Sequence, residues 1–192
     1  MQADSAARAH SAGAHRAATV WLTGLSGAGK STIATALVGA LLADGIAAAS
    51  LDGDVLRTGL NANLGFDAPG RAEAVRRAGE ASLLLAAAGV VPVVALISPY
   101  RADRDRVRER HAAAGVRFIE AFVDAPIDVV AARDPKGLYA RARAGLIPGF
   151  TGISDPYEPP VAAEVVLRTA EHGVDACVRE LRAALLRADI SR

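Results

Sequence analysis

The strongest chemical signal in the sequence is a glycine-rich octet near the N-terminus. Residues 24–31 read GLSGAGKS and match the pattern G-x-x-x-x-G-K-[ST] at every position. Glycines let a backbone curl so that several N–H groups point at phosphate oxygens, and a following helix adds the positive end of its dipole. Lys30 would reach the outer phosphates, and Ser31 would supply a hydroxyl ligand to Mg²⁺. The predicted ATP-binding residues are Gly24, Leu25, Ser26, Gly27, Ala28, Gly29, Lys30, Ser31 and Thr32.

Two carboxylates follow the next apolar segment along the chain. Asp52 and Asp54 lie in the sequence LDGD, at the end of a predicted strand at 46–51. Carboxylates at the carboxyl edge of a parallel strand face the ligand-binding side of the sheet. Asp54 could orient a substrate hydroxyl or accept its proton, and Asp52 could support Mg²⁺ through water. In the alternative interpretation, the pair forms an Asp-Gly turn in which Asp54 caps the next helix.

Cationic and aromatic residues after this pair could bind an anionic, aromatic substrate. Arg57 and Arg71 could hold an anion in a bidentate way, although a solvated helix face is the commoner place for an arginine such as Arg71. Phe66 lies among glycine and polar residues, so its ring could stack on a base or fill a gap in the core. Ser98 could contact substrate or phosphate, or it could cap the helix that begins after Pro99.

A basic segment late in the chain has the composition of a lid. Residues 133–153 contain glycines, several arginines and Lys136, which is one of only two lysines in the chain. A lid excludes water from the transferred phosphoryl group, so that the triphosphate is not simply hydrolysed. The alternative is an ordinary surface helix and loop.

Short apolar runs alternate with helical segments along the chain. The predicted strands are 18–23, 46–51, 90–97, 116–123 and 164–167. The predicted helices are 30–43, 71–88, 102–114, 126–132, 138–144 and 174–188. This order indicates an α/β fold of the P-loop NTPase type, a three-layer sandwich whose parallel sheet of about five strands is flanked by helices. We expect a disordered tail at 1–17 and a single domain at 18–192, with a mobile lid at about 133–153.

Composition argues against several classes of function. The chain has 22 basic and 21 acidic residues, a balance that disfavours a general binder of nucleic acid or membrane surfaces. No apolar stretch reaches the ~20 uncharged residues that span a bilayer. The single cysteine, Cys177, rules out an intrachain disulfide and is compatible with a reducing, cytoplasmic location. The four histidines lack the spacing of metal ligands.

Several blocks of sequence together resemble the adenylyl-sulfate kinase (APS kinase) family. They run in the family's order from about residue 20 to about residue 167 and include GLSGAGKST, LDGD, LGF, ISPYRADRDRVR, FIEAFVDAP, RDPKGLYARARAG and FTGISDPYEPP. The resemblance covers most of the chain, and ISPYRADRDR and DPKGLY are far more specific than the octet. It implies that ATP with Mg²⁺ phosphorylates the 3′-hydroxyl of adenylyl sulfate to give 3′-phosphoadenylyl sulfate. It also implies a homodimer.

The resemblance assigns roles on the acceptor side of the reaction. Asp54 would activate the 3′-hydroxyl, and Arg57 and Arg71 would bind the phosphosulfate. Phe66 and Phe150 would stack on the two faces of the adenine of adenylyl sulfate.

The resemblance also places residues around the phosphates. Lys136 matches the family's lid lysine, and we expect it to bind substrate together with Gly137 and Leu138. Ser98 matches a serine that the family describes as a phosphoserine intermediate. Direct in-line transfer to a positioned hydroxyl needs no such intermediate, so we expect Ser98 to be a site residue without a covalent role.

The chain also departs from the family pattern, and two other functions stay open. Ala74 stands where the family commonly has an asparagine that contacts substrate, so substrate affinity could differ. One alternative function is a P-loop kinase for another small hydroxylated metabolite. The other is a non-catalytic nucleotide-binding partner of a sulfate-activating complex, against which the intact Lys30, Ser31 and Asp54 argue.

Overall fold

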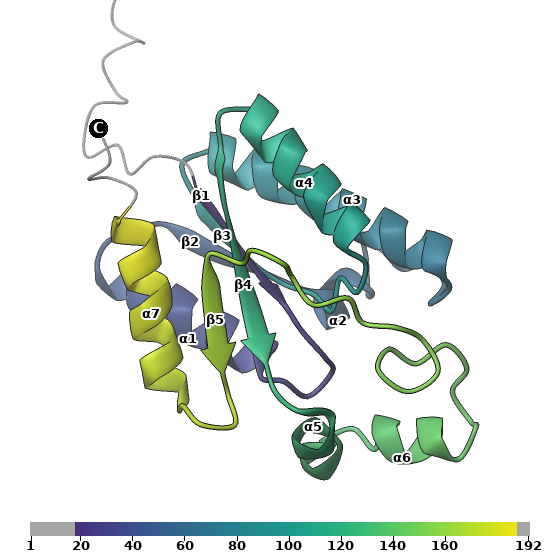
Figure 1. Cartoon of the computed structure of the whole chain (residues 1–192). Helices are drawn as coiled ribbons and strands as arrows, with labels where there is room; N and C mark the ends of the chain where they lie inside the picture. Colours follow the sequence, from purple (N-terminus) through teal and green to yellow (C-terminus); the bar gives the residue numbers. More distant parts are fainter. Residues whose placement is uncertain (1–17, 188–192) are drawn as a thin grey trace, which may run out of the picture.

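Five parallel strands form the middle layer of the structure, a computed structural model that describes residues 18–187 (Figure 1). The strands are β1 (Ala18–Thr23), β2 (Ala48–Asp52), β3 (Val91–Ala95), β4 (Arg117–Asp124) and β5 (Val165–Arg168). Their order across the sheet is β2-β3-β1-β4-β5. This is the predicted α/β sandwich, and all five predicted strands are confirmed. The predicted tail at 1–17 lies outside the described residues.

Helices cover both faces of the sheet (Figure 1). One face carries α1 (Lys30–Ala43) and α7 (Val174–Leu186), and the other carries α3 (Ala68–Ala87) and α4 (Arg101–Ala113). Three short helices lie beyond the carboxyl ends of the strands: α2 (Gly53–Leu56), α5 (Ile127–Arg133) and α6 (Leu138–Arg143). Within residues 18–187, none of the helices combines the length and the apolarity that crossing a membrane requires.

The central strand β1 is buried along its whole length because both of its faces meet helices. Val20 and Leu22 belong to the larger core, under α1 and α7. Trp21 points to the opposite face, where it packs with Phe118, Val75 of α3 and other residues of a second core. An uninterrupted apolar strand is what burial on both faces requires, and the sequence shows one here.

Several element boundaries differ from the predictions. Strand β2 begins two residues later than expected, and the one-turn helix α2 was not predicted. Helix α3 begins at Ala68 instead of residue 71, because the Asp67 carboxylate accepts a hydrogen bond from the Gly70 N–H and Pro69 fits the first turn. The alternative that Ser98 caps α4 is wrong, since that helix begins at Arg101 without a side-chain cap.

A buried polar cluster joins α3, α4 and β1 on the second face. His111, at the end of α4, donates through Nδ1 to the Val107 carbonyl at 2.8 Å. Its Nε2 lies 3.1 Å from the Thr19 hydroxyl and 3.0 Å from the Ser82 hydroxyl. Burial lowers the pKa of His111 below its ordinary value of 6.5. The cluster therefore holds the neutral imidazole.

This cluster predicts a pH-dependent stability. As the pH falls through 6.5 the unfolded chain takes up a proton that folded His111 resists, so the free energy of unfolding decreases. Between pH 7 and pH 5, the free energy of unfolding measured in urea should decrease less in His111→Gln than in the unsubstituted protein. The matched control is His172→Gln, at an exposed histidine, and it should keep the full decrease. Equal slopes in all three proteins would contradict the assignment.

Candidate active site

The glycine-rich octet forms the turn between β1 and α1. Gly24 has φ 152°, and a Cβ there would lie 2.4 Å from the Val123 carbonyl oxygen on β4, so only glycine fits. Lys30 is 8% exposed, and its ammonium donates to the Gly24 and Leu25 carbonyls at 2.9 and 2.7 Å. The lysine side chain thus curls back over the turn, as the octet predicts for a residue that faces phosphate.

The charge of Lys30 is destabilised by its surroundings. Burial lowers its pKa to about 8, against the opposing effect of the nearby carboxylates of Asp52 and Asp54. Lys136 contributes a smaller lowering through its own positive charge. A polyanion bound in the turn would restore the preference for the ammonium form.

A short hydrogen bond connects the octet to the acidic pair. The Ser31 hydroxyl donates to Asp52 Oδ2 at 2.5 Å, and Asp52 Oδ1 accepts from the Asp54 N–H at 2.9 Å. Asp52 is therefore the N-cap of α2, and the alternative in which Asp54 is the cap is wrong. The Asp54 carboxylate instead forms an ion pair with Lys136, and both side chains are largely exposed.

Two arginines fix the backbone that carries Phe66. Arg57 Nη1 donates to the Leu64 and Gly65 carbonyls at 2.6 and 3.0 Å, and Arg71 Nε donates to the Phe66 carbonyl at 2.6 Å. The Arg57 guanidinium also lies over the Phe66 ring, 4.1 Å from its centroid. Burial and the charge of Arg71 lower the pKa of Arg57. Arg71 is thus close enough for its charge to disfavour the charge of Arg57.

The two phenylalanines predicted to clamp an adenine have different environments. Phe66 is 66% exposed, whereas Phe150 is 8% exposed and packs against Tyr139 of α6 in a T-shaped pair, with 5.0 Å between the centroids. The Tyr139 hydroxyl donates to the Ser26 carbonyl of the octet at 2.9 Å. The predicted lid segment is therefore anchored on the phosphate side, and only Phe66 presents an open ring.

The residues beside Lys136 begin α6. Gly137 is the N-cap of this helix, with φ 64°, and the Leu138 N–H donates to Asp134 Oδ1 at 2.7 Å. This geometry gives Gly137 and Leu138 a structural role, and it places Lys136 directly before the helix.

Ser98 points into the protein instead of toward the outer edge of the sheet. It is 2% exposed, and its hydroxyl accepts a hydrogen bond from the Trp21 indole N–H at 3.1 Å. Its φ of 40° is rare for a residue other than glycine, and Arg104 donates to its carbonyl at 2.7 Å. This environment suits a turn-forming residue with a strained backbone better than a nucleophile.

Sequence reasoning missed several residues that support the octet. The Thr169 hydroxyl donates to the Ala28 carbonyl at 2.8 Å, and Arg133 donates to the Thr169 carbonyl at 2.6 Å. Thr169 directly follows β5, so the rule that selected Asp52, a polar residue at a strand's carboxyl end, could have found it. Tyr139 lies in the block DPKGLY, but nothing in that block predicted its hydrogen bond to the octet.

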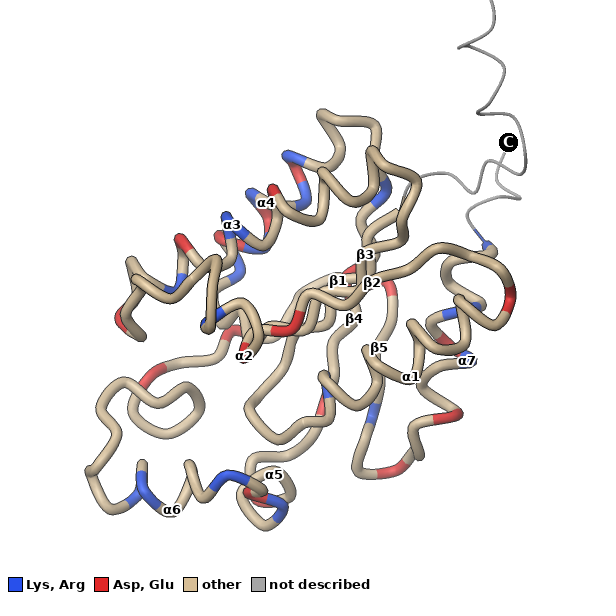
Figure 2. Tube along the Cα trace, turned by 180° about the vertical axis from the view of Figure 1, so that it is seen from behind, with Lys and Arg blue, Asp and Glu red and all other residues tan. Residues whose placement is uncertain are grey.

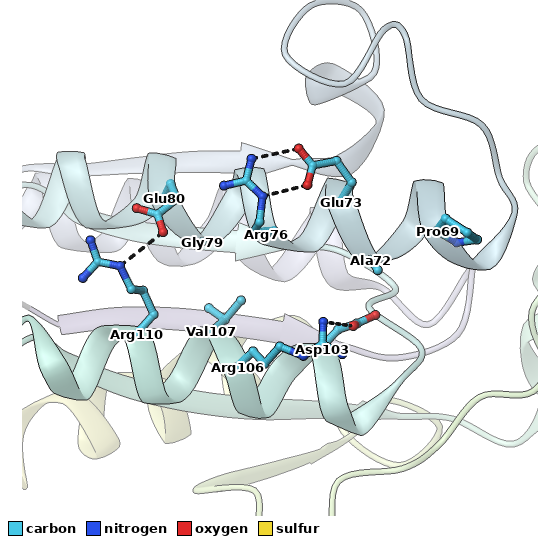
Figure 3. Close-up of a pocket in the computed structure, with 10 residues that line it drawn as sticks. All are labelled: Pro69, Ala72, Glu73, Arg76, Gly79, Glu80, Asp103, Arg106, Val107 and Arg110. Atoms are coloured by element: carbon cyan, nitrogen blue, oxygen red, sulfur yellow. Dashed lines mark hydrogen bonds and ion pairs between the residues drawn. The ribbon is translucent and has the colours of Figure 1, made fainter.

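A separate hollow of about 260 Å³ lies between α3 and α4 (Figure 3). Figure 2 shows acidic and basic residues mixed along both helices. The residues that line the hollow form three ion pairs: Arg76 with Glu73, Arg110 with Glu80 and Arg106 with Asp103. Because these cations already face carboxylates, the hollow is a poorer anion site than the region around Arg57, which forms no ion pair within residues 18–187.

Comparison with known proteins agrees with this geometry. The sequence model of the family described as Adenylylsulphate kinase matches residues 16–168. The adenylyl-sulfate kinase of Saccharomyces cerevisiae is 54% identical over 159 residues, which are 83% of this chain and 79% of the yeast protein.

Solved structures give the same result. The Mycobacterium tuberculosis APS kinase in complex with AMPPNP and APS superposes with a TM-score of 0.86 at 46% identity, over 88% of this chain and 98% of that one. The hexameric APS kinase from Thiobacillus denitrificans gives a TM-score of 0.67 at 31% identity, over 91% of this chain and 29% of the other. With its phosphate-binding turn, its acidic pair and these relatives, the chain belongs to the adenylylsulphate kinase family.

Proposed function

We propose that this protein transfers the γ-phosphoryl group of ATP to the 3′-hydroxyl of adenylyl sulfate. The observation that carries the proposal is the continuous set of contacts from the octet to the acidic pair. Ser31 bonds to Asp52, Asp52 caps the turn that presents Asp54, and Asp54 pairs with Lys136. These contacts support the proposal, because they would let a phosphate-binding turn, a carboxylate base and a lid lysine all reach one reacting phosphoryl group.

On the donor side, backbone N–H groups of the octet would bind the phosphates of ATP. Lys30 would exchange its bonds to the Gly24 and Leu25 carbonyls for bonds to the β- and γ-phosphates. Thr32, in the first turn of α1, belongs to the same proposed subsite. The helix dipole of α1 would add to the positive potential there.

On the acceptor side, the exposed Asp54 carboxylate would orient the 3′-hydroxyl and accept its proton as the new P–O bond forms. Lys136 would then lie beside the transferred group and neutralise part of its charge. The buried Ser98 hydroxyl, engaged by Trp21, supports a direct transfer with no covalent enzyme intermediate.

The phosphosulfate and the base of adenylyl sulfate would be bound by the residues around Phe66. Arg57 and Arg71 supply two neighbouring guanidinium groups, and no carboxylate pairs closely with Arg57 among the described residues. Phe66 would stack on the adenine, an interaction worth ~1–3 kcal/mol per base. For Phe150 to cover the other face of the adenine, its ring would have to turn away from Tyr139.

Magnesium fits the oxygen atoms between the octet and the acidic pair. In the described residues there is no group of three or more His, Cys, Asp or Glu side chains that could hold a metal. Mg²⁺ commonly uses one or two protein oxygens and takes the rest from phosphates and water, so the adjacent Ser31 hydroxyl and Asp52 carboxylate suit it. When bound, it would neutralise charge on the phosphates, with Ser31 as direct ligand and Asp52 acting through water.

The assembly and location of the protein are further proposals. We propose a homodimer, as the family resemblance implies, although the Thiobacillus relative is described as hexameric. Light scattering over a range of concentrations would give the mass. The one free cysteine, Cys177, is buried, and its pKa is raised by burial, which suits a reducing, cytoplasmic environment.

The direct test of the proposed function is a coupled ADP-release assay. Adenylyl sulfate should stimulate ADP release strongly, whereas AMP and other adenosine 5′-phosphates should not. Turnover that favours another hydroxylated metabolite would indicate a different kinase. A protein that binds ATP and releases no ADP with any acceptor would instead be a non-catalytic partner.

The lowered pKa of Lys30 predicts that nucleotide binding takes up protons. At pH 8.5 the free protein would have Lys30 largely neutral, and bound MgATP would return it to the ammonium form. Titration calorimetry in two buffers of different ionisation enthalpy should reveal uptake of up to about one proton at pH 8.5, and much less at pH 7. Apparent enthalpies that agree between the buffers at pH 8.5 would argue against a buried, neutralised lysine.

Substitution of Asp54 should affect the chemical step more than substrate binding. Asp54→Asn keeps the shape of the side chain and removes the base, so we expect kcat to fall by ~100-fold or more while KM for adenylyl sulfate changes little. Asp105→Asn, at an exposed position on α4, is the matched control and should leave both constants unchanged. A variant whose only defect is a raised KM would remove Asp54 from the chemistry.

A further inference from the structure

The segment 149–155, within and just after the predicted lid, folds into a compact loop. The Phe150 carbonyl accepts backbone hydrogen bonds from Ile153, Ser154 and Asp155 at 3.0, 3.0 and 3.1 Å. The Phe150 N–H donates to the Ser154 hydroxyl at 2.9 Å. Because its own hydrogen bonds close it, the 149–155 loop can act as one unit.

On the donor side, this loop touches the octet. A Cβ on Gly152 would lie 2.9 Å from a methyl carbon of Leu25, so the loop and the phosphate-binding turn approach as closely as a glycine allows. Phe150 packs against Tyr139, whose hydroxyl donates to the Ser26 carbonyl. A shift of the loop would therefore displace the residues of the octet that it contacts.

On the acceptor side, the loop is held by the Arg71 guanidinium and, through Asp155, by the Tyr100 hydroxyl. Arg71 Nη2 donates to the Gly149 carbonyl at 2.7 Å, while its Nε donates to the Phe66 carbonyl at 2.6 Å. Arginine has five N–H donors, so these two bonds leave others for an anion. Arg71 thus joins the loop to the Phe66 backbone and still has donors for the phosphosulfate.

The orientation of Arg71 depends on a carboxylate in the same loop. Asp155 Oδ2 lies 3.7 Å from Arg71 Nε, and the Tyr100 hydroxyl donates to the same Oδ2 at 2.9 Å. Both charged side chains are at least three-quarters buried. Burial and the hydrogen bond to Asp155 raise the pKa of Tyr100, so the phenol stays a donor. Two side chains from different elements thus locate one guanidinium.

We propose that Asp155, held by Tyr100, is a positioning residue for Arg71 and couples the binding of adenylyl sulfate to the seating of the 149–155 loop against the phosphate-binding turn. The inference rests on the proposed function, since it concerns how that acceptor is held. Without the carboxylate, Arg71 would sit beside Arg57 with less compensation for its charge, and its guanidinium would be free to rotate away from the Gly149 and Phe66 carbonyls.

Kinetics of isosteric variants test this coupling. Asp155→Asn should raise KM for adenylyl sulfate ~10-fold or more, because the carboxylate orients Arg71 on the acceptor side. KM for ATP should change less than about twofold, because the contacts from Phe150 through Tyr139 to the octet remain. Tyr100→Phe should act in the same direction at about threefold, because it weakens the hold on Asp155 without removing it. Asp175→Asn, at an exposed position on α7, is the matched control and should match the unsubstituted protein.

A double-substitution cycle separates positioning from general stability. In an Arg71→Lys background, Asp155→Asn should raise KM by less than about twofold, since the guanidinium it orients is already gone. Adenylyl sulfate should also slow amide exchange at residues 153–155 in the unsubstituted protein and not in Asp155→Asn. The inference would be overturned if the effects of Arg71→Lys and Asp155→Asn on KM for adenylyl sulfate were fully additive. It would also be overturned if Asp155→Asn raised KM for ATP as much as KM for adenylyl sulfate, or if Asp155→Asn and Tyr100→Phe left KM for adenylyl sulfate unchanged. Failure of the unsubstituted protein to release ADP with adenylyl sulfate would instead defeat the proposed function on which the inference rests.

Discussion

The two oxygen atoms of Asp52 are the point on which the geometry of the site depends. Strands β1 and β2 are not neighbours, because β3 lies between them, so the octet and the acidic pair start about 10 Å apart across the sheet. The Asp52 carboxylate spans part of that gap. Its Oδ2 accepts a hydrogen bond from the Ser31 hydroxyl, and its Oδ1 accepts one from the Asp54 N–H at the start of α2. Donor and acceptor sides are thus fixed relative to each other by one side chain.

The cationic side chains around Asp52 suit negatively charged substrates. Lys30 is buried with only carbonyl oxygens as hydrogen-bond partners, and burial lowers its pKa. On the acceptor side, burial and the nearby charge of Arg71 lower the pKa of Arg57. Lys30 and Arg57 would each gain an anionic partner when phosphate or phosphosulfate binds, and this would offset the effects that lower their pKa values in the free protein. This complementarity agrees with membership of the adenylylsulphate kinase family.

Local sequence predicted the parts of the site that local geometry determines. The octet, its strand and its helix follow from glycine and lysine spacing, and the place of Asp52 follows from the rule for strand ends. Contacts between distant segments were not predictable, because periodicity does not fix the direction of a side chain. Ser98 turns inward to Trp21, and Phe150 turns toward Tyr139. Asp155 lies in a stretch rich in glycine and proline, where no pattern distinguished it from a solvated loop residue.

The two substrates must react directly with each other at the carboxyl edge of the sheet, where β1 and β2 end. The stereochemistry of transfer from ATP with an isotopically chiral γ-thiophosphate to adenylyl sulfate tests that requirement. A single in-line displacement predicts inversion at phosphorus. Retention of configuration would indicate two successive transfers through an enzyme-bound phosphoryl group, and it would contradict a site in which Ser98 is buried and Asp54 activates the acceptor.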